Sequence, residues 1–172
     1  TELVQDLKRT ALITDEIVRC AKTGRKMLIL SERRQHLSDI QEMLARRDIT
    51  DCGMYIGGMN QAQLDKSAEC QIILGSYSMA STGLDIKDMS CLILASPLTD
   101  ITQACGRILR NDTAHSKLII DIVDRVSVFV GQMRRRVALY HKQSFRVHGD
   151  GADDALRQTS LDNAATRQLA IV

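Results

Sequence analysis

Apolar residues along the chain follow two patterns, which predict strands and helices in alternation. Short continuous apolar runs predict strands at Met27–Leu30, Ile72–Leu74, Cys91–Leu94 and Leu118–Ile122, with a weaker run over Thr50–Ile56. Amphipathic spacing predicts helices over Leu3–Ala21, Glu32–Arg47, Thr99–Arg110 and Ser127–Lys142. Because continuous runs indicate strands that are covered on both faces, we expect an α/β fold with a mainly parallel central sheet and helices on both faces.

The composition changes after Val147, where an apolar helical pattern gives way to glycine and aspartate. The stretch from His148 to Asp154 is typical of a linker or turn, and the residues after it are polar with a modest helical pattern. We therefore expect one folded domain over residues 1–148, followed by a linker and a flexible or loosely helical tail over residues 149–172.

Composition indicates a globular protein, since 44% of the 172 residues are hydrophobic and 26% are charged. No apolar run reaches the roughly 18 residues that a membrane span needs, and no signal peptide opens the chain. The five cysteines are scattered without C-x-x-C pairs, which fits a reducing compartment, the cytoplasm or nucleus, rather than secretion. A phosphatase loop at Cys105 is excluded because Arg110 follows it at the wrong spacing.

The net charge of +2 is too small for the whole surface to attract nucleic acid. Local cationic patches remain possible at Arg33–Arg34, Arg46–Arg47 and Arg134–Arg136, and the alternative is that these residues lie on solvated helix faces. With 3% aromatic residues and no tryptophan, the chain has too few aromatic side chains to form a surface on which bases stack. Any bound strand would be held by its phosphates.

The segment from Gln103 to Arg110 carries the clearest chemistry. In a helix, Gln103, Arg107 and Arg110 lie at i, i+4 and i+7 and share one face, which suits a polyphosphate. The alternative for the arginines is a pair of surface cations, and the alternative for Gln103 is a capping box with Asp100. Gly106 costs about 1 kcal/mol in a helix interior, which close approach of a ligand or partner would explain.

Other candidate segments directly follow predicted strands. These are Ser31 to Gln35, the Gly57–Gly58 turn, a small-residue loop from Ser76 to Asp85, and Ser96 to Asp100. Ligands of doubly wound parallel sheets bind beyond the carboxyl ends of the strands. We therefore expect all four segments at the same edge of the sheet.

Together, in this order and spacing, these segments resemble the second half of the motor core of superfamily 2 helicases, over about Thr14 to Gln143. The segment Ser31–Leu37 is similar to motif IV, Ser76–Asp85 to motif V, and Gln103–Arg110 to motif VI in its Q-x-x-G-R-x-x-R form. Among these proteins the chain looks closest to the DNA helicases of phages and large DNA viruses. The resemblance implies a RecA-like three-layer sandwich.

The resemblance also implies roles for individual residues. Arg110 would be the arginine finger, with Arg107 beside it on the phosphates. The implied nucleotide-binding residues are Gly83, Asp85, Gln103, Arg107 and Arg110. The implied nucleic-acid-binding residues are Arg33, Gly57, Gly58, Ser76, Ser78 and Ser81. Simple turns are the alternative at Gly57–Gly58 and at Gly83–Asp85.

The sequence contains no G-x-x-x-x-G-K-[ST] loop, and no acidic D-E-x-x box follows a predicted strand. We therefore expect ATP and Mg²⁺ to be bound mainly by an N-terminal RecA-like lobe, against which this chain closes. The implied function is that of the second motor lobe of an ATP-dependent helicase that unwinds branched or RNA-paired DNA, with RNA as a further possible partner and no membrane. The alternatives are a duplex translocase without strand separation and a non-enzymatic helicase-like scaffold.

Overall fold

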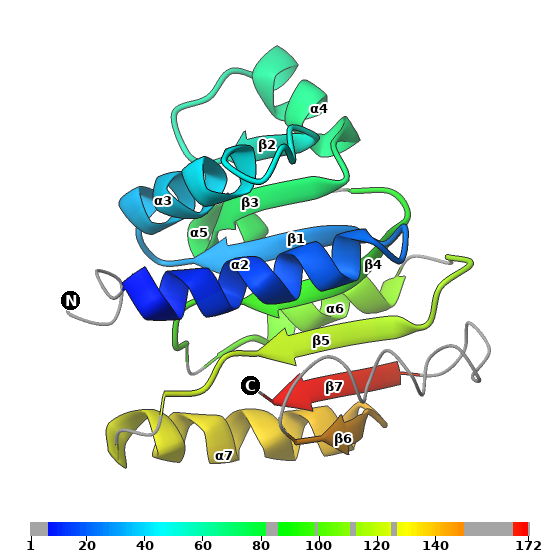
Figure 1. The fold of residues 1–172 in the computed structure, drawn as a ribbon. Helices are drawn as coiled ribbons and strands as arrows, with labels where there is room; N and C mark the ends of the chain where they lie inside the picture. Colours follow the sequence, from blue (N-terminus) through cyan, green and yellow to red (C-terminus); the bar gives the residue numbers. More distant parts are fainter. Residues whose placement is uncertain are drawn as a thin grey trace.

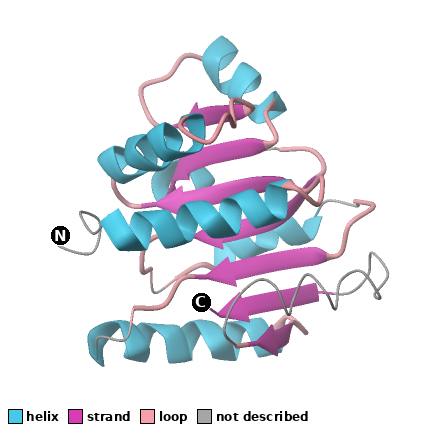
Figure 2. Cartoon of the chain, viewed as in Figure 1, coloured by secondary structure: helices cyan, strands magenta, loops and turns pink. Residues whose placement is uncertain are grey.

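The computed structural model describes residues 7–81, 86–98, 100–110, 113–124, 127–149 and 167–171. Over these residues a twisted sheet forms the middle of the molecule, and helices pack on both of its faces (Figure 1). The same view by element type shows the alternation of strands and helices along the chain (Figure 2). The predicted α/β class is confirmed.

Every pair of neighbouring strands in the sheet is parallel, and the strand order is β2-β3-β1-β4-β5-β7-β6. The register places Ser31 beside Ser76, and Leu94 beside Asp121, so the carboxyl ends of the central strands lie level with one another. The strands are β1 (Lys26–Ser31), β2 (Cys52–Tyr55), β3 (Ile72–Ser76), β4 (Met89–Leu94), β5 (Lys117–Asp121), β6 (Arg146–His148) and β7 (Arg167–Ile171).

Alternate residues of the buried strands supply two separate cores. Ile29 and the strand residues on the same face of the sheet pack against α2 (Leu7–Ala21) and α3 (Arg34–Ala45). Leu28 and the residues facing with it pack on the other side against α5 (Tyr77–Ser81), α6 (Thr102–Arg110) and α7 (Ser127–Lys142). A strand covered on both faces shows continuous hydrophobicity, which is why these strands were predictable.

The helix α4 (Gln61–Glu69) was not predicted, because its sequence is mostly polar and only Leu64 and Ser67 are buried. Local hydrogen bonds start it instead, since the side chain of Asn60 and that of Gln63 cap each other's backbone amides. Its contact with β2 is close: a Cβ at Gly53 would lie 2.7 Å from the Cα of Ser67. Glycine is therefore required at this position of β2.

Two further expectations need correction. The stretch expected to be a loop from Ser76 to Asp85 begins as the helix α5, because a run of small residues can turn directly out of β3. Residues 167–171, placed in a flexible or loosely helical tail, form β7 between β5 and β6. For these five residues the expectation is wrong, because the backbone of β5 gains a parallel partner that no local pattern reveals.

Candidate functional site

The carboxyl edge of the sheet gathers the polar residues that follow the strands. Ser31, Ser76 and Asp121 end β1, β3 and β5, and Ser96 follows β4. All four are buried, so each needs a partner within the protein. The backbone N–H of Glu32 donates to Oγ of Ser96 at 2.9 Å, which ties the end of β1 to the end of β4.

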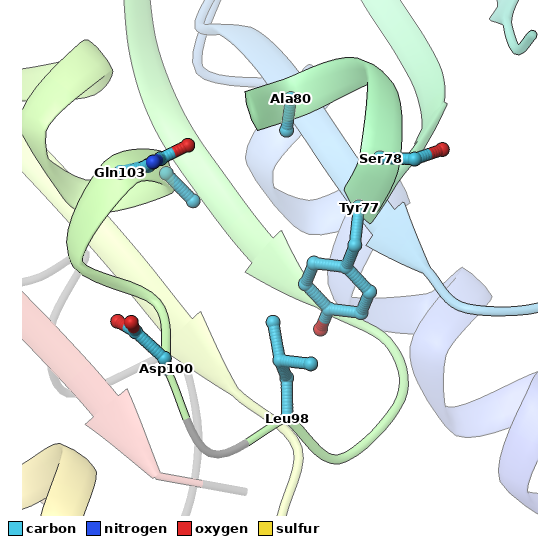
Figure 3. A pocket seen from close by; sticks show the side chains of 7 residues that line it. Tyr77, Ser78, Ala80, Leu98, Asp100 and Gln103 are labelled. Atoms are coloured by element: carbon cyan, nitrogen blue, oxygen red, sulfur yellow. The ribbon is translucent and has the colours of Figure 1, made fainter. Parts of the chain in front are cut away.

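A pocket of about 330 Å³ opens at this edge between α5 and α6. Figure 3 shows Tyr77 and Ala80 of α5 on one side of the pocket, Asp100 and Gln103 on the other, and Leu98 between them; Ser78 also belongs to its lining. Its lining combines apolar side chains with two hydroxyls, one amide and one carboxylate. The motif V and motif VI segments are thus neighbours, although they are about 20 positions apart in the sequence.

Tyr77 fixes α5 against the segment that leads into α6. Its hydroxyl donates to the carbonyl oxygen of Ser96 at 2.7 Å. Burial raises the pKa of Tyr77, so the phenol stays protonated and remains a donor at neutral pH. Sequence analysis did not single out Tyr77, and the only signal was its place directly after a buried strand.

Ser76 and Ser78 also lie together, with their hydroxyl oxygens 3.0 Å apart. Ser76 is buried at the end of β3, whereas Ser78 lines the pocket. Ser81 belongs to the backbone of α5, and its side chain lies outside the described residues. The two serines that are described therefore lie at the edge where strand-contacting hydroxyls are expected.

Asp100 caps the amino terminus of α6. Its Oδ1 accepts from the backbone N–H of Thr102 at 2.9 Å, and this hydrogen bond lowers the pKa of the carboxyl group. Asp100 therefore caps an amide at the start of α6, whereas the capping box predicted with Gln103 stays a prediction. Gln103 is exposed and lines the pocket beside it.

Arg107 and Arg110 lie within the helical backbone of α6, as the motif spacing requires. Their side chains lie outside the described residues. Gly83 and Asp85 also lie outside the described residues. No heavy atom of the described residues lies within 4 Å of a Cβ built on Gly106, so this part of the fold does not itself require a glycine there.

A buried ion pair between Arg136 of α7 and Asp121 of β5 holds the segment that leads into α6. Nε and Nη2 of Arg136 donate to the two carboxylate oxygens of Asp121 at 2.8 and 3.0 Å, and its Nη1 donates to the carbonyl oxygen of Leu98 at 2.7 Å. Burial alone would lower the pKa of Arg136, but the hydrogen bond and charge of Asp121 outweigh it, so the net shift is upward. The hydroxyl of Tyr140 donates to the same carboxylate at 3.1 Å.

This pair corrects one expectation for the arginine run at 134–136. Arg136 is only 2% exposed and belongs to no surface patch, whereas Arg134 and Arg135 are exposed. The three consecutive arginines are identical in type, so composition could not predict which of them is buried. Their burial differs because only one side of α7 faces the sheet. The sequence signal was helical spacing: Arg136 and Tyr140 are four positions apart and share one face.

The other candidate strand-contacting residues lie around the ends of β1 and β2. Arg33 is exposed and directly precedes α3. Gly57 and Gly58 form a turn after β2, in which Gly58 has a φ of +90° and the carbonyl oxygen of Gly57 accepts from Nη2 of Arg34 at 2.6 Å. Gly58 therefore has a conformational reason to be glycine, as the simple-turn alternative states.

A second buried arginine was also missed. Arg9 in α2 donates to both carboxylate oxygens of Asp124, at 2.8 and 3.0 Å, and to the carbonyl oxygen of Ala95 at 2.6 Å. The pair lies 115 positions apart in the sequence, so no local pattern could predict it. Together, Arg9 and Arg136 hold the two ends of the segment 95–98 that leads to α6.

The cysteines offer no reactive thiol near the pocket. Burial raises the pKa of Cys105 to about 12, so its thiol is protonated at neutral pH. Within the described residues, no group of three or more His, Cys, Asp or Glu is arranged to hold a metal ion. The described helices include none with the length and hydropathy needed to span a bilayer.

Comparison with known proteins places this geometry in a family. The profile described as "Helicase conserved C-terminal domain" matches residues 8–112. A protein of Acanthamoeba polyphaga mimivirus, L396, named as a candidate ATP-dependent RNA helicase, is 37% identical over 162 residues, which are 92% of this chain and 31% of that protein. A protein of African swine fever virus, QP509L, named in the same way, is 26% identical over 102 residues, which are 58% of this chain and 20% of that protein.

Solved structures share the fold. The crystal structure of T4 UvsW matches with a TM-score of 0.62 and 13% identity, covering 99% of this chain and 35% of that one. The second domain of the DEAD-box helicase Mss116p matches with a TM-score of 0.55 and 10% identity, covering 94% of this chain and 58% of that one. The chain thus spans about a third or less of its viral relatives, and the expected RecA-like architecture is confirmed.

Proposed function

Because the chain belongs to the family of helicase C-terminal domains, we propose that it is the second motor lobe of an ATP-dependent helicase. ATP and Mg²⁺ are held mainly by an N-terminal lobe of the same protein. Closure of the two lobes brings α6 to the phosphates, and opening after hydrolysis moves the strand-contacting loops along nucleic acid.

The observation that carries this proposal is the adjacency of α5 and α6 at the carboxyl edge. Ser78 and Gln103 line one pocket there, and α6 continues from that pocket to Arg107 and Arg110. Backbone spacing of i, i+4 and i+7 gives Gln103 and the two arginines a common side of the helix. Such a side suits the negative charge that a transferring γ-phosphoryl group spreads over its oxygens.

Residues on the same edge supply the contacts to nucleic acid in this proposal. Ser76 ends β3 and Ser78 and Ser81 follow it, while Arg33 and the Gly57–Gly58 turn follow β1 and β2. Hydroxyls, a guanidinium and exposed amides bind phosphates and carry little sequence preference. Gly83 and Asp85 complete the nucleotide side.

We assign an RNA-paired duplex as the substrate. The mimivirus and African swine fever virus relatives are named as candidate RNA helicases, and the sequence resemblance points to helicases of branched or RNA-paired DNA. An RNA–DNA hybrid satisfies both lines of inference. A duplex translocase would move along such a substrate without releasing a strand.

The test is ATP turnover by the complete two-lobe protein carrying Arg110→Ala. We expect the turnover rate to fall at least tenfold while ATP binding survives, because a finger acts on the transition state rather than on the bound substrate. The control is Arg46→Ala, which removes only an exposed ion pair with Glu42. An unchanged rate in the Arg110 variant would refute the finger, and turnover without release of a labelled strand would favour the translocase.

A further inference from the structure

The helix α7 lies within the longest stretch of the chain that contains no acidic residue. Residues 125–149 contain six of the 23 Lys and Arg residues of the chain and none of its 21 Asp and Glu residues. The rest of the chain therefore carries a net charge of −4, although the whole carries +2. Acidic residues resume only at Asp150, so one stretch accounts for the basic character of this protein.

The fold gathers this charge on one side of α7. Arg136 and Tyr140 face the sheet and are buried. The opposite side is exposed and consists of Arg134, Arg135, Ala138, His141 and Lys142, which we call the α7 cationic face. It holds three Lys and Arg side chains, one histidine and one alanine, with no carboxylate between them.

Two exposed arginines on other helices pair with acids. Arg46 pairs with Glu42 at 2.6 Å, and Arg47 pairs with Asp15 at 2.6 Å. On α7 the positions four residues from Arg134, Arg135 and Lys142 hold no acid, so the usual helical ion pairs cannot form. Such a face repels itself unless an anion covers it.

We propose that the α7 cationic face binds the phosphate backbone of double-stranded nucleic acid. Arg135 and Lys142 lie seven residues apart, about 10 Å along the helix axis, which is close to three base-pair steps of about 3.4 Å. Arg134 lies next to Arg135, so this side of the helix offers three Lys and Arg side chains to phosphates.

A single strand is the less suitable partner. Sequence-tolerant binding of single strands relies on aromatic side chains that stack on the bases. The α7 cationic face contains no Phe, Tyr or Trp side chain. Its contacts are therefore limited to phosphates.

This surface is separate from the candidate strand-contacting residues. Figure 1 shows α7 along the β6 and β7 side of the sheet, at the opposite end from β2 and α4. Arg33 and the Gly57–Gly58 turn lie near the β2 end. The inference rests on the proposed function only in taking nucleic acid as the partner, and it adds a duplex anchor beside the moving strand.

The test measures binding of this chain to a fluorescent blunt DNA duplex about two helical turns long, by anisotropy, between about 50 and 200 mM salt. The variant is R134E/R135E/K142E, and the matched control is K22E/K66E/K87E, which reverses three exposed lysines on other surfaces. We expect at least tenfold weaker duplex binding for the α7 variant, a log–log salt slope smaller by about 2 to 3, and less than a twofold change for the control.

Three results would overturn the proposal: no duplex binding by the unchanged chain, equal losses in variant and control, or a loss confined to a single-stranded probe or an acidic polyglutamate. Circular dichroism checks that both triple variants stay folded, which we expect because all six side chains are exposed. A negative result in this binding assay would not refute the motor-lobe proposal, which is tested separately by ATP turnover of the Arg110 variant. The two proposals can therefore fail independently.

Discussion

The buried side chain of His36 makes the stability of the fold depend on pH. It is fully buried in α3, its Nδ1 lies 3.0 Å from Oγ of Ser31, and its Nε2 has no hydrogen-bond partner in the part of the chain that is described. Burial, and then the charge of Arg9, lowers the pKa of His36 from 6.5 to about 4. Protonation therefore brings an unpartnered charge into the core beside β1.

We predict that the free energy of unfolding falls as the pH is lowered from about 6.5 to about 4, because the unfolded chain binds a proton at His36 that the folded chain does not. The effect of this group is about 1–3 kcal/mol. His36→Asn keeps a polar group near Ser31 but cannot titrate, so its urea-unfolding curves should lose this part of the pH dependence. Equal slopes for both proteins would contradict the assignment.

At the scale of elements, the position of α6 depends on side chains that lie far from it in the sequence. Arg136 of α7 holds Asp121 of β5 and the carbonyl of Leu98, and Tyr77 of α5 holds the carbonyl of Ser96. Residues 96–98, which precede α6, are thus held by side chains from two helices. The motif that carries Arg107 and Arg110 follows this segment.

Removal of Arg136 should be costly, because it leaves the carboxylate of Asp121 buried without its cation. We predict that Arg136→Met lowers the free energy of unfolding by about 3–5 kcal/mol. Arg135→Met, one position away but exposed, should change it by less than about 0.5 kcal/mol. Urea denaturation measures both, and similar costs for the two variants would show that the buried pair does not hold α7 in place.

Elements with a continuous or amphipathic apolar pattern could be predicted from the sequence, and those without one could not. The strands β1, β3, β4 and β5 show continuous apolar runs because helices cover both faces. By contrast, α4 depends on a cap at Asn60, α5 on a direct exit from β3, and β7 on pairing with β5 residues that lie 50 positions away in the sequence. These three elements depend on particular hydrogen bonds or on segments distant in the sequence, and a periodic apolar pattern does not reveal such contacts.

Across the whole molecule, the sequence predicted the motif residues but not the long-range hydrogen bonds that hold the segments around them. Gln103, Ser76 and Ser78 were named from spacing, and the fold brings Gln103 and Ser78 to one pocket. Tyr77, Arg9 and Arg136, which hold that pocket in place, act through contacts of 19, 86 and 38 positions in sequence separation. Motifs are local, whereas the network that orients them is formed only on folding.

In the proposed motor, Arg107 and Arg110 act on the phosphates while another lobe holds the nucleotide. The decisive measurement is the affinity of the complete two-lobe protein for ADP–aluminium fluoride, which resembles the transferring phosphoryl group, compared with its affinity for a non-hydrolysable ATP analogue. We predict that Arg110→Ala weakens binding of the fluoride complex at least tenfold and leaves binding of the ATP analogue within about twofold. Equal changes for both ligands would contradict the account.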